Sequence, residues 1–191
     1  MIKIGILGDI GSGKSYVAQQ FGCPVFNADK EVSKIYKSNK KCFISLKKEL
    51  PNYIFSFPIK KKELKKAILG NQKNLKKINR IVHPIVRSKM NNFIKKNKNK
   101  KLIILDIPLL IENKLYRKDY ILIFVQAERE NIKKRLKLRK NYNPLILKKL
   151  NKLQIKLEKK RKKSHYVIKN NFRKITIKKN VKKIKNIILK K

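Results

Sequence analysis

The sequence predicts an α/β fold, and three observations lead to that prediction. Two apolar runs of strand length, KLIILDIP at residues 101–108 and DYILIFV at residues 119–125, are continuous rather than alternating. Both of their faces are therefore expected to be covered, as in a parallel sheet. A third apolar run, at residues 2–7, passes through glycines into a helical pattern. Elsewhere, apolar residues recur at helical spacing.

The N-terminal elements alternate between strand and helix. Residues 2–7, IKIGIL, predict a buried strand, and residues 15–21 place apolar side chains at helical steps after the glycine-rich turn. Residues 24–29, PVFNAD, predict a second strand, and residues 30–37 predict the helix that follows it.

Residues from about 40 to 100 have a helical pattern without the β-branched runs of a central sheet, and we interpret them as a helical insertion. Pro84 predicts a break in this helical pattern, because proline lacks the backbone N–H. The apolar positions at helical spacing are Leu64, Ile68, Leu75, Ile78 and Val82.

The C-terminal third predicts a charged helical segment, a strand and a closing helix. Residues 128–162 are highly charged but keep one apolar stripe, and residues 165–171, HYVIKNN, predict the last strand. The stripe consists of Ile146, Leu150, Leu153 and Leu157, and the closing helix is defined by Ile177, Val181, Ile184 and Ile188.

The charge balance is strongly positive, with 54 basic and 11 acidic residues and a formal net charge of +43. Only eight of the basic residues are arginine, and the lysines are spread along the whole chain, which indicates a general compositional bias rather than a surface built for nucleic acid. Cys23 and Cys42 have no C-x-x-C spacing, which favours a reducing, cytoplasmic location. No apolar stretch has the length of a membrane span or the form of a signal peptide.

The segment Gly8 to Ser15, GDIGSGKS, matches the phosphate-binding pattern G-x-x-x-x-G-K-[ST] between a strand and a helix. Its glycines let successive backbone N–H groups approach phosphate oxygens. Lys14 supplies a cation for the β- and γ-phosphates, and the Ser15 hydroxyl can bind Mg²⁺. The flanking elements and the Lys-Ser pair disfavour the alternative of a simple glycine turn.

Two aspartates follow predicted strands, where the carboxyl ends of a parallel sheet line a ligand crevice. Asp29 can accept a proton from an attacking hydroxyl, or it can cap the next helix. Asp106 can support a metal ion, or it can turn the chain before Pro108.

Arg135 and Arg139 are four residues apart, so on a helix they would share a face and could stabilise phosphate charge or simply meet solvent. His83 is a lone histidine before Pro84, a setting in which a structural role is as reasonable as a functional one.

The chain resembles the dephospho-coenzyme A kinases. The segments that carry the resemblance, from residue 2 to about 172, are GILGDIGSGKSYVAQQF, PVFNADK, INRIVHPIV, LDIPLLIEN, RLKLR, LQIKLEKK and VIKNN. The resemblance implies an ATP-dependent transfer of phosphate to the ribose 3′-hydroxyl of dephospho-CoA, which yields CoA and ADP in the last step of coenzyme A synthesis. It also implies a P-loop kinase core with a parallel five-stranded sheet, a helical substrate-binding insertion and a helical lid.

The same resemblance implies a division of the chain and roles for its residues. The core would comprise residues 1–30, 101–127 and 164–191, the dephospho-CoA-binding part residues 31–100, and the lid residues 128–163. ATP would be bound by Gly8, Gly11, Ser12, Gly13, Lys14, Ser15, Tyr16, Arg135 and Arg139. Dephospho-CoA would be bound by Asp29, His83, Pro108, Leu109, Leu110 and Glu112. Lys14, Asp29 and Arg139 would be catalytic, and Ser15 and Asp106 would bind Mg²⁺.

The chain departs from the family pattern at five positions: Asp9, Tyr16, Asn27, Lys61 and His165. Because Lys14, Ser15, Asp29 and Arg139 remain, these changes would affect efficiency and substrate affinity rather than the reaction class. The competing interpretations are another small-molecule P-loop kinase and a basic nucleic-acid-binding P-loop protein. No specific nucleic acid, membrane or obligate protein partner is expected.

Overall fold

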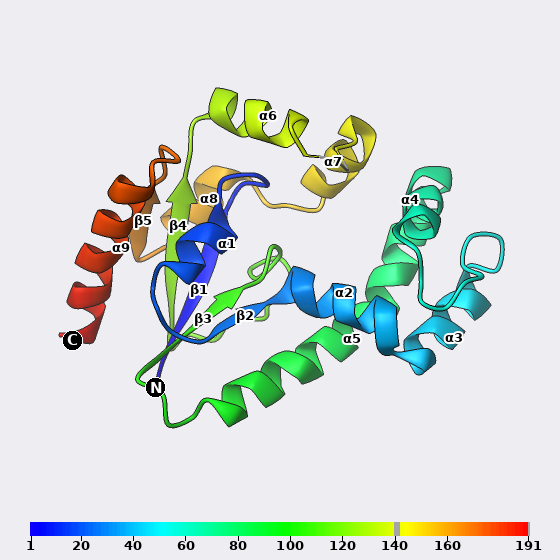
Figure 1. Ribbon diagram of the computed structural model, residues 1–191, viewed down its shortest axis with the longest axis horizontal. Coiled ribbons are helices and arrows are strands. Elements are labelled where there is room, and N and C mark those ends of the chain that lie inside the picture. The colour runs from blue at the N-terminus through cyan, green and yellow to red at the C-terminus, as the bar shows by residue number, and fades with distance from the viewer. Residues whose placement is uncertain (140–141, 191) are drawn as a thin grey trace.

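The computed structural model describes residues 1–139 and 142–190, and it confirms the α/β fold. The sheet of this described part has five parallel strands in the order β2-β3-β1-β4-β5 (Figure 1). The strands are β1 (Ile2–Gly8), β2 (Val25–Asn27), β3 (Leu102–Asp106), β4 (Tyr120–Gln126) and β5 (Tyr166–Lys169).

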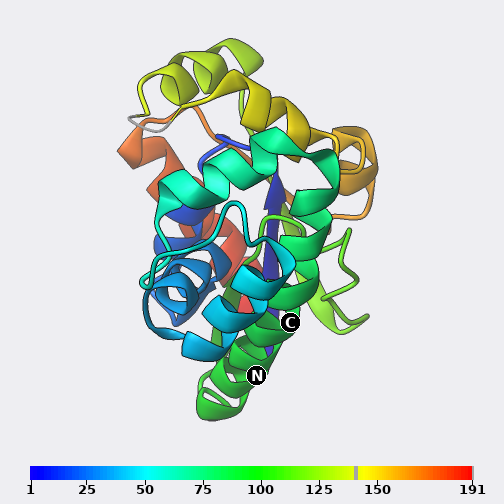
Figure 2. The same cartoon turned by 90° about the vertical axis from the view of Figure 1, so that its right-hand side faces the viewer.

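The helices lie around this sheet (Figures 1 and 2). They are α1 (Lys14–Gln19), α2 (Ala28–Ser38), α3 (Lys40–Glu49), α4 (Lys61–Gly70), α5 (Gln72–Lys96), α6 (Arg129–Lys137), α7 (Pro144–Asn151), α8 (Leu157–Lys162) and α9 (Lys174–Leu189).

Each face of the sheet has its own apolar core, because successive strand side chains point to opposite faces. Ile103 and Leu105 pack on the face covered by α2 to α5, and Ile104 packs on the face covered by α1 and α9. In Figure 1, α9 and α5 accordingly lie on opposite sides of the strands. Both faces are buried, which is why the strands appear in the sequence as continuous apolar runs.

The predicted break at Pro84 is wrong, since α5 continues through this proline to Lys96. Pro84 lies on the exposed side of the helix, where the carbonyl group that loses its N–H partner can be solvated. On the opposite side, Val82 and Val86 keep the buried stripe in register across the proline. Tertiary packing of this stripe outweighs the local preference of proline.

The charged segment predicted at residues 128–162 forms three short helices, α6, α7 and α8, rather than one continuous helix. The predicted stripe is divided between α7 and α8. Lys149 of α7 donates hydrogen bonds from Nζ to the carbonyl oxygens of Ile68 (2.6 Å) and Leu69 (3.1 Å) near the end of α4. Figure 2 shows α7, in yellow, next to the blue-green α4.

The strands of the sheet point towards α6 and α7 (Figure 1), so their carboxyl ends, the β1–α1 loop and the start of α2 meet in one region. None of the helices in the described ranges is both long enough and apolar enough to cross a membrane.

Candidate active site

The glycine-rich loop between β1 and α1 has a backbone conformation that requires glycine. Gly11 and Gly13 have φ values of 88° and 87°, in the left-handed region. A side chain at Gly13 would also collide with Asn170, whose Nδ2 donates a 2.7 Å hydrogen bond to the carbonyl oxygen of Ser12. The loop is therefore held in shape from the end of β5, and Asn170 is a supporting residue that the motif alone does not reveal.

Lys14, at the start of α1, donates hydrogen bonds to backbone carbonyl groups at the start of the loop. Its Nζ lies 2.6 Å from the carbonyl oxygen of Asp9 and 3.3 Å from that of Gly8. Burial lowers the pKa of Lys14 to about 8, although the carboxylate of Asp106 acts in the opposite direction. An anion in the loop would raise this pKa, because it would stabilise the charged ammonium.

A cavity of about 550 Å³ opens beside this loop and brings together most of the predicted site residues. This volume is within the usual range for small-molecule sites. The predicted residues that line it are Gly11, Gly13, Lys14, Ser15, Tyr16, Asp29, His83, Asp106, Pro108, Leu109, Arg135 and Arg139.

Asp29 lines this cavity from the first turn of α2, and it is not the helix cap. The cap is Asn27, whose Oδ1 accepts a 2.8 Å hydrogen bond from the backbone N–H of Lys30. Burial raises the pKa of Asp29, and the carboxylate of Asp106 raises it further, whereas Lys14 and Arg139 lower it. A raised pKa makes this carboxylate a better proton acceptor, which suits a general base.

Asn27, Asp106 and Ser15 form a hydrogen-bonded group at the floor of the cavity. β2 and β3 place Asn27 opposite Asp106 in the sheet register. The Nδ2 of Asn27 donates to Oδ2 of Asp106 at 2.5 Å and to Oγ of Ser15 at 3.4 Å. The group offers a carboxylate and a hydroxyl, which are the hard oxygen donors that Mg²⁺ prefers.

The two predicted arginines reach the cavity from different positions. Arg135 lies in α6, and its guanidinium stacks 4.4 Å from the ring centroid of Phe172. Arg139 lies beyond the end of α6 rather than on the same helix. Both arginines line the cavity, although they do not share one face of a helix as the sequence predicts.

Four predicted residues do not line this cavity. Gly8 is the last residue of β1, Ser12 is fully buried in the loop, and Leu110 is fully buried in the core. Glu112 is turned away, because its Oε1 accepts from Lys160 Nζ at 2.8 Å and from the backbone N–H of Ile155 at 3.1 Å.

Of the five positions that depart from the family pattern, Tyr16 lines this cavity, and Asp9, Asn27, Lys61 and His165 are not among its lining residues. Asn27 donates to Asp106, which does line it. Lys61 is exposed at the start of α4. His165 extends the pairing of β5 with β4, since its Nδ1 accepts from the backbone N–H of Leu122 at 2.9 Å.

The cavity also has lining residues that were not predicted, which are Ile10, Ala28, Val32, Ile107, Asn113, Leu150 and Gln154. Ile107 and Asn113 lie close to predicted residues in the sequence. Leu150 of α7 belongs to the predicted apolar stripe, and Gln154 lies in the family segment LQIKLEKK, but neither residue was predicted to line the site. Asn170 lies within the predicted last strand, residues 165–171, whereas the structure ends β5 at Lys169 and places Asn170 directly after it. With this strand end, the rule that the carboxyl ends of parallel strands line the ligand crevice would have found Asn170.

Comparison with known proteins agrees with this geometry. The family model for dephospho-CoA kinase matches residues 2–175. A dephospho-CoA kinase of Wolbachia pipientis is 35% identical over 170 residues, which covers 86% of this chain and 87% of that protein. Among solved structures, TT1252 from Thermus thermophilus has a TM-score of 0.78 at 26% identity and covers 99% of this chain and 97% of that one.

A dephospho-CoA kinase structure from Campylobacter jejuni shares the fold, with a TM-score of 0.64 at 24% identity over 98% of this chain and 97% of that one. The family match covers the phosphate loop, both cavity aspartates and both cavity arginines. The chain belongs to the dephospho-CoA kinase family.

Proposed function

We propose that this chain catalyses the reaction of its family, the transfer of the γ-phosphate of ATP to the ribose 3′-hydroxyl of dephospho-CoA. The observation that supports this proposal most directly is the convergence of Lys14, Asp29 and Arg139 on one cavity beside the glycine-rich loop. The loop suits a triphosphate, and Asp29 faces the cavity without serving as a helix cap.

In the proposed reaction, the oxygen of the acceptor hydroxyl attacks the γ-phosphorus while Asp29 accepts the proton of that hydroxyl. A new O–P bond forms, the bond from the γ-phosphorus to the bridging oxygen breaks, and ADP leaves with that electron pair. Lys14 and Arg139 offset the negative charge on the transferring group. The protein contributes mainly by positioning and charge, since phosphoryl transfer requires little covalent work from its side chains.

The residues present fit Mg²⁺ as the accompanying cation. We assign its protein contacts to the Ser15 hydroxyl and the Asp106 carboxylate, which Asn27 orients. Among the described residues no three His, Cys, Asp or Glu side chains cluster as a metal site, so the nucleotide phosphates would supply much of the coordination. When bound, Mg²⁺ neutralises charge on the phosphates.

We further propose that residues 31–100 receive dephospho-CoA and that residues 128–163 act as a lid that excludes water. The hydrogen bonds from Lys149 to the end of α4 support this proposal, because they join these two parts directly. We place the reaction in the cytoplasm, where free thiols such as Cys23 and Cys42 persist.

Asp29→Asn tests the assignment of the base. Without the carboxylate, we expect kcat for dephospho-CoA to fall by about 10²–10⁴-fold while the Kd for ATP stays within a few-fold of wild type. In the wild type, kcat/KM should decrease as the pH falls through the raised pKa of Asp29, and the variant should lose this acid limb. Coupled measurement of ADP release and titration calorimetry with ATP give these quantities.

Two further variants separate the loss of the base from loss of ATP binding and from general effects of removing a carboxylate. Lys14→Ala should lose both transfer and tight ATP binding. Asp119→Asn should keep wild-type activity, because Asp119 pairs with Lys3 outside the cavity. Normal turnover by Asp29→Asn would remove the assignment of Asp29 as the base, and a wild-type chain that does not convert dephospho-CoA would refute the proposed function.

A further inference from the structure

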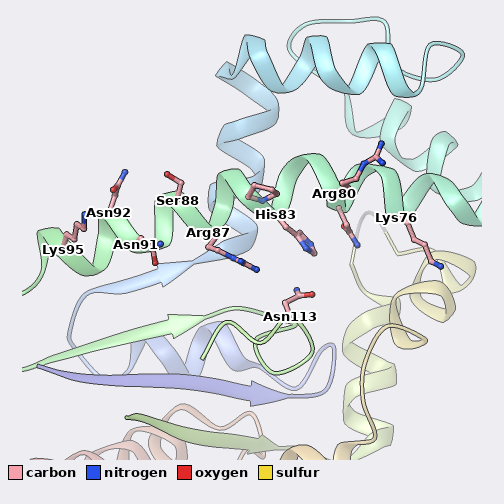
Figure 3. Close-up of a pocket in the computed structure, with 11 residues that line it drawn as sticks. Lys76, Arg80, His83, Arg87, Ser88, Asn91, Asn92, Lys95 and Asn113 are labelled. Carbon is pink, nitrogen blue, oxygen red and sulfur yellow. The ribbon is translucent and has the colours of Figure 1, made fainter. Parts of the chain in front are cut away.

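A second cavity, of about 820 Å³, runs along α5 beside the site described above (Figure 3). Many of its lining side chains recur every three or four residues along α5, so they share one side of the helix. They are Lys76, Arg80, His83, Arg87, Asn91 and Lys95, and Asn113 lies across from them. We call this cavity the α5 groove.

The α5 groove is continuous with the candidate active site. His83 and Asn113 line both cavities, so a ligand can extend from one to the other past these two side chains. At its other end the groove joins a further depression, which Arg87, Asn91 and Lys95 also line. When the hydroxyl of an acceptor molecule reaches Asp29, the rest of that molecule can therefore lie along α5.

The charge of the groove favours an anion. No carboxylate is among its lining residues in the part of the chain that the structure describes. Arg80 is not available to a ligand in the groove, since it points towards α3 in Figure 3 and its Nη2 lies 2.8 Å from Oε1 of Glu49. Arg87 has no hydrogen bond or ion pair with any described residue, and Figure 3 shows it beside His83 on the side that faces Asn113.

The order of the groups along α5 matches the order of groups in dephospho-CoA. In that molecule the ribose bearing the 3′-hydroxyl is joined through its 5′-oxygen to a diphosphate, and the diphosphate is joined to an arm that contains two amides. In the protein the order is Asp29, then His83 and Arg87, then the amides of Asn91 and Asn92. From Arg87 to Lys95 the helix provides about 12 Å of groove for the arm.

We propose that Arg87 and His83 bind the diphosphate of the acceptor, and that Arg87 makes the enzyme select diphosphate-bearing acceptors over plain adenosine. This inference rests on the proposed function. The planar guanidinium of Arg87 can donate two parallel hydrogen bonds to phosphate oxygens, which a lysine cannot. His83 supplies one N–H donor between the active site and Arg87, and Asn113 closes the opposite wall.

Arg87→Ala and Arg87→Lys test this proposal, with Lys89→Ala as a control that removes a cation outside the groove from the same helix. Titration calorimetry should give a Kd for dephospho-CoA that rises about 10–100-fold in Arg87→Ala and less in Arg87→Lys, because a hydrogen bond to a charged group is removed or weakened. The KM for ATP should not change. Lys89→Ala should bind dephospho-CoA within about twofold of wild type, because Lys89 does not line the groove and its Nζ lies 3.7 Å from Oε2 of Glu31.

Competition experiments identify the diphosphate as the group that Arg87 recognises. At saturating ATP, the inhibition constant of ADP-ribose, which carries the diphosphate but lacks the pantetheine arm, should rise in Arg87→Ala in parallel with the Kd for dephospho-CoA. The inhibition constant of adenosine should stay unchanged. Equal losses for adenosine and ADP-ribose, no loss for either, or the same loss in Lys89→Ala would each overturn the proposal.

The binding readout separates this proposal from the proposed function. If wild-type enzyme converts dephospho-CoA and Arg87→Ala binds it normally, only the role of Arg87 fails. If the wild type binds dephospho-CoA through Arg87 but does not convert it, the proposed function fails and the binding site stands.

Discussion

Asn27 uses both ends of its side-chain amide at the floor of the active site. Its Oδ1 caps α2, and its Nδ2 donates to Oδ2 of Asp106 at 2.5 Å. This donor holds an almost fully buried carboxylate in place without adding a second negative charge. An aspartate at position 27 could keep the cap but would have no proton to donate to Asp106 at neutral pH.

Asn27→Asp should therefore destabilise the ligand-free protein. We expect the free energy of unfolding to fall by about 1–3 kcal/mol, because Asp106 loses its donor and faces a second carboxylate. Denaturant unfolding without divalent cations measures this loss, and the loss should shrink at lower pH, where the two carboxylates can share a proton. Asn71→Asp is the control, since Asn71 caps α5 with an exposed side chain. Equal stability of the two variants would refute the role assigned to the Asn27 donor.

Residue roles at this site could be predicted only in part. The phosphate loop was predictable because its chemistry is contained in eight consecutive residues. The choice between base and helix cap for Asp29 was open, since it depends on whether Asn27 caps the helix first. Glu112 lies in a family motif, yet its partner Lys160 comes from 48 positions later in the chain. Such a pairing is a property of the tertiary structure.

The ion pair between Glu112 and Lys160 ties α8 to the segment that follows β3. Lys160 is 1% exposed, and its Nζ also donates to Oε1 of Gln154 at 2.7 Å. The same segment carries Pro108 and Leu109, which line the active-site cavity. A buried charge pair of this kind costs desolvation energy, so its main consequence is to fix where the two elements meet.

Lys160→Met should cost about 3–5 kcal/mol of unfolding free energy, because it leaves the Glu112 carboxylate buried without its cation. Lys159→Met, one position earlier on the same helix and exposed, should change stability by less than about 0.5 kcal/mol. The double variant Glu112→Gln with Lys160→Met should recover part of the loss. Denaturant unfolding measures all three, and equal stability of the two single lysine variants would contradict this account.

Helices and strands could be predicted where the apolar pattern of their own residues determined them. All five predicted strands and the closing helix are present. In β1, β3 and β4, burial on both faces leaves a continuous apolar run, and in α9 burial along one side leaves an apolar stripe. The prediction was wrong at Pro84 because a local rule competed with a buried stripe that extends far along α5. The segment at residues 128–162 was predicted as helical, but its division into α6, α7 and α8 depends on contacts with α4 and the sheet.

At the scale of the whole molecule, positive charge is far in excess of what its carboxylates can neutralise. The described residues form six ion pairs, and these use only four carboxylates: Glu31, Glu49, Glu112 and Asp119. Against a net charge of +43, most lysines therefore repel one another across the surface. Repulsion of this kind lowers the stability of the compact state relative to the expanded chain.

Added sodium chloride should consequently raise the melting temperature of this protein. Raising the ionic strength from about 0.01 M to 0.1 M shortens the screening length from about 30 Å to about 10 Å, which weakens repulsion between distant lysines more than the short ion pairs. Each kcal/mol regained corresponds to about 2–4 °C for a chain of this size. Differential scanning calorimetry measures the shift, and Lys14→Ala separates screening from chloride bound in the phosphate loop. A melting temperature that stays constant or falls over this range in both proteins would show that surface repulsion does not limit stability.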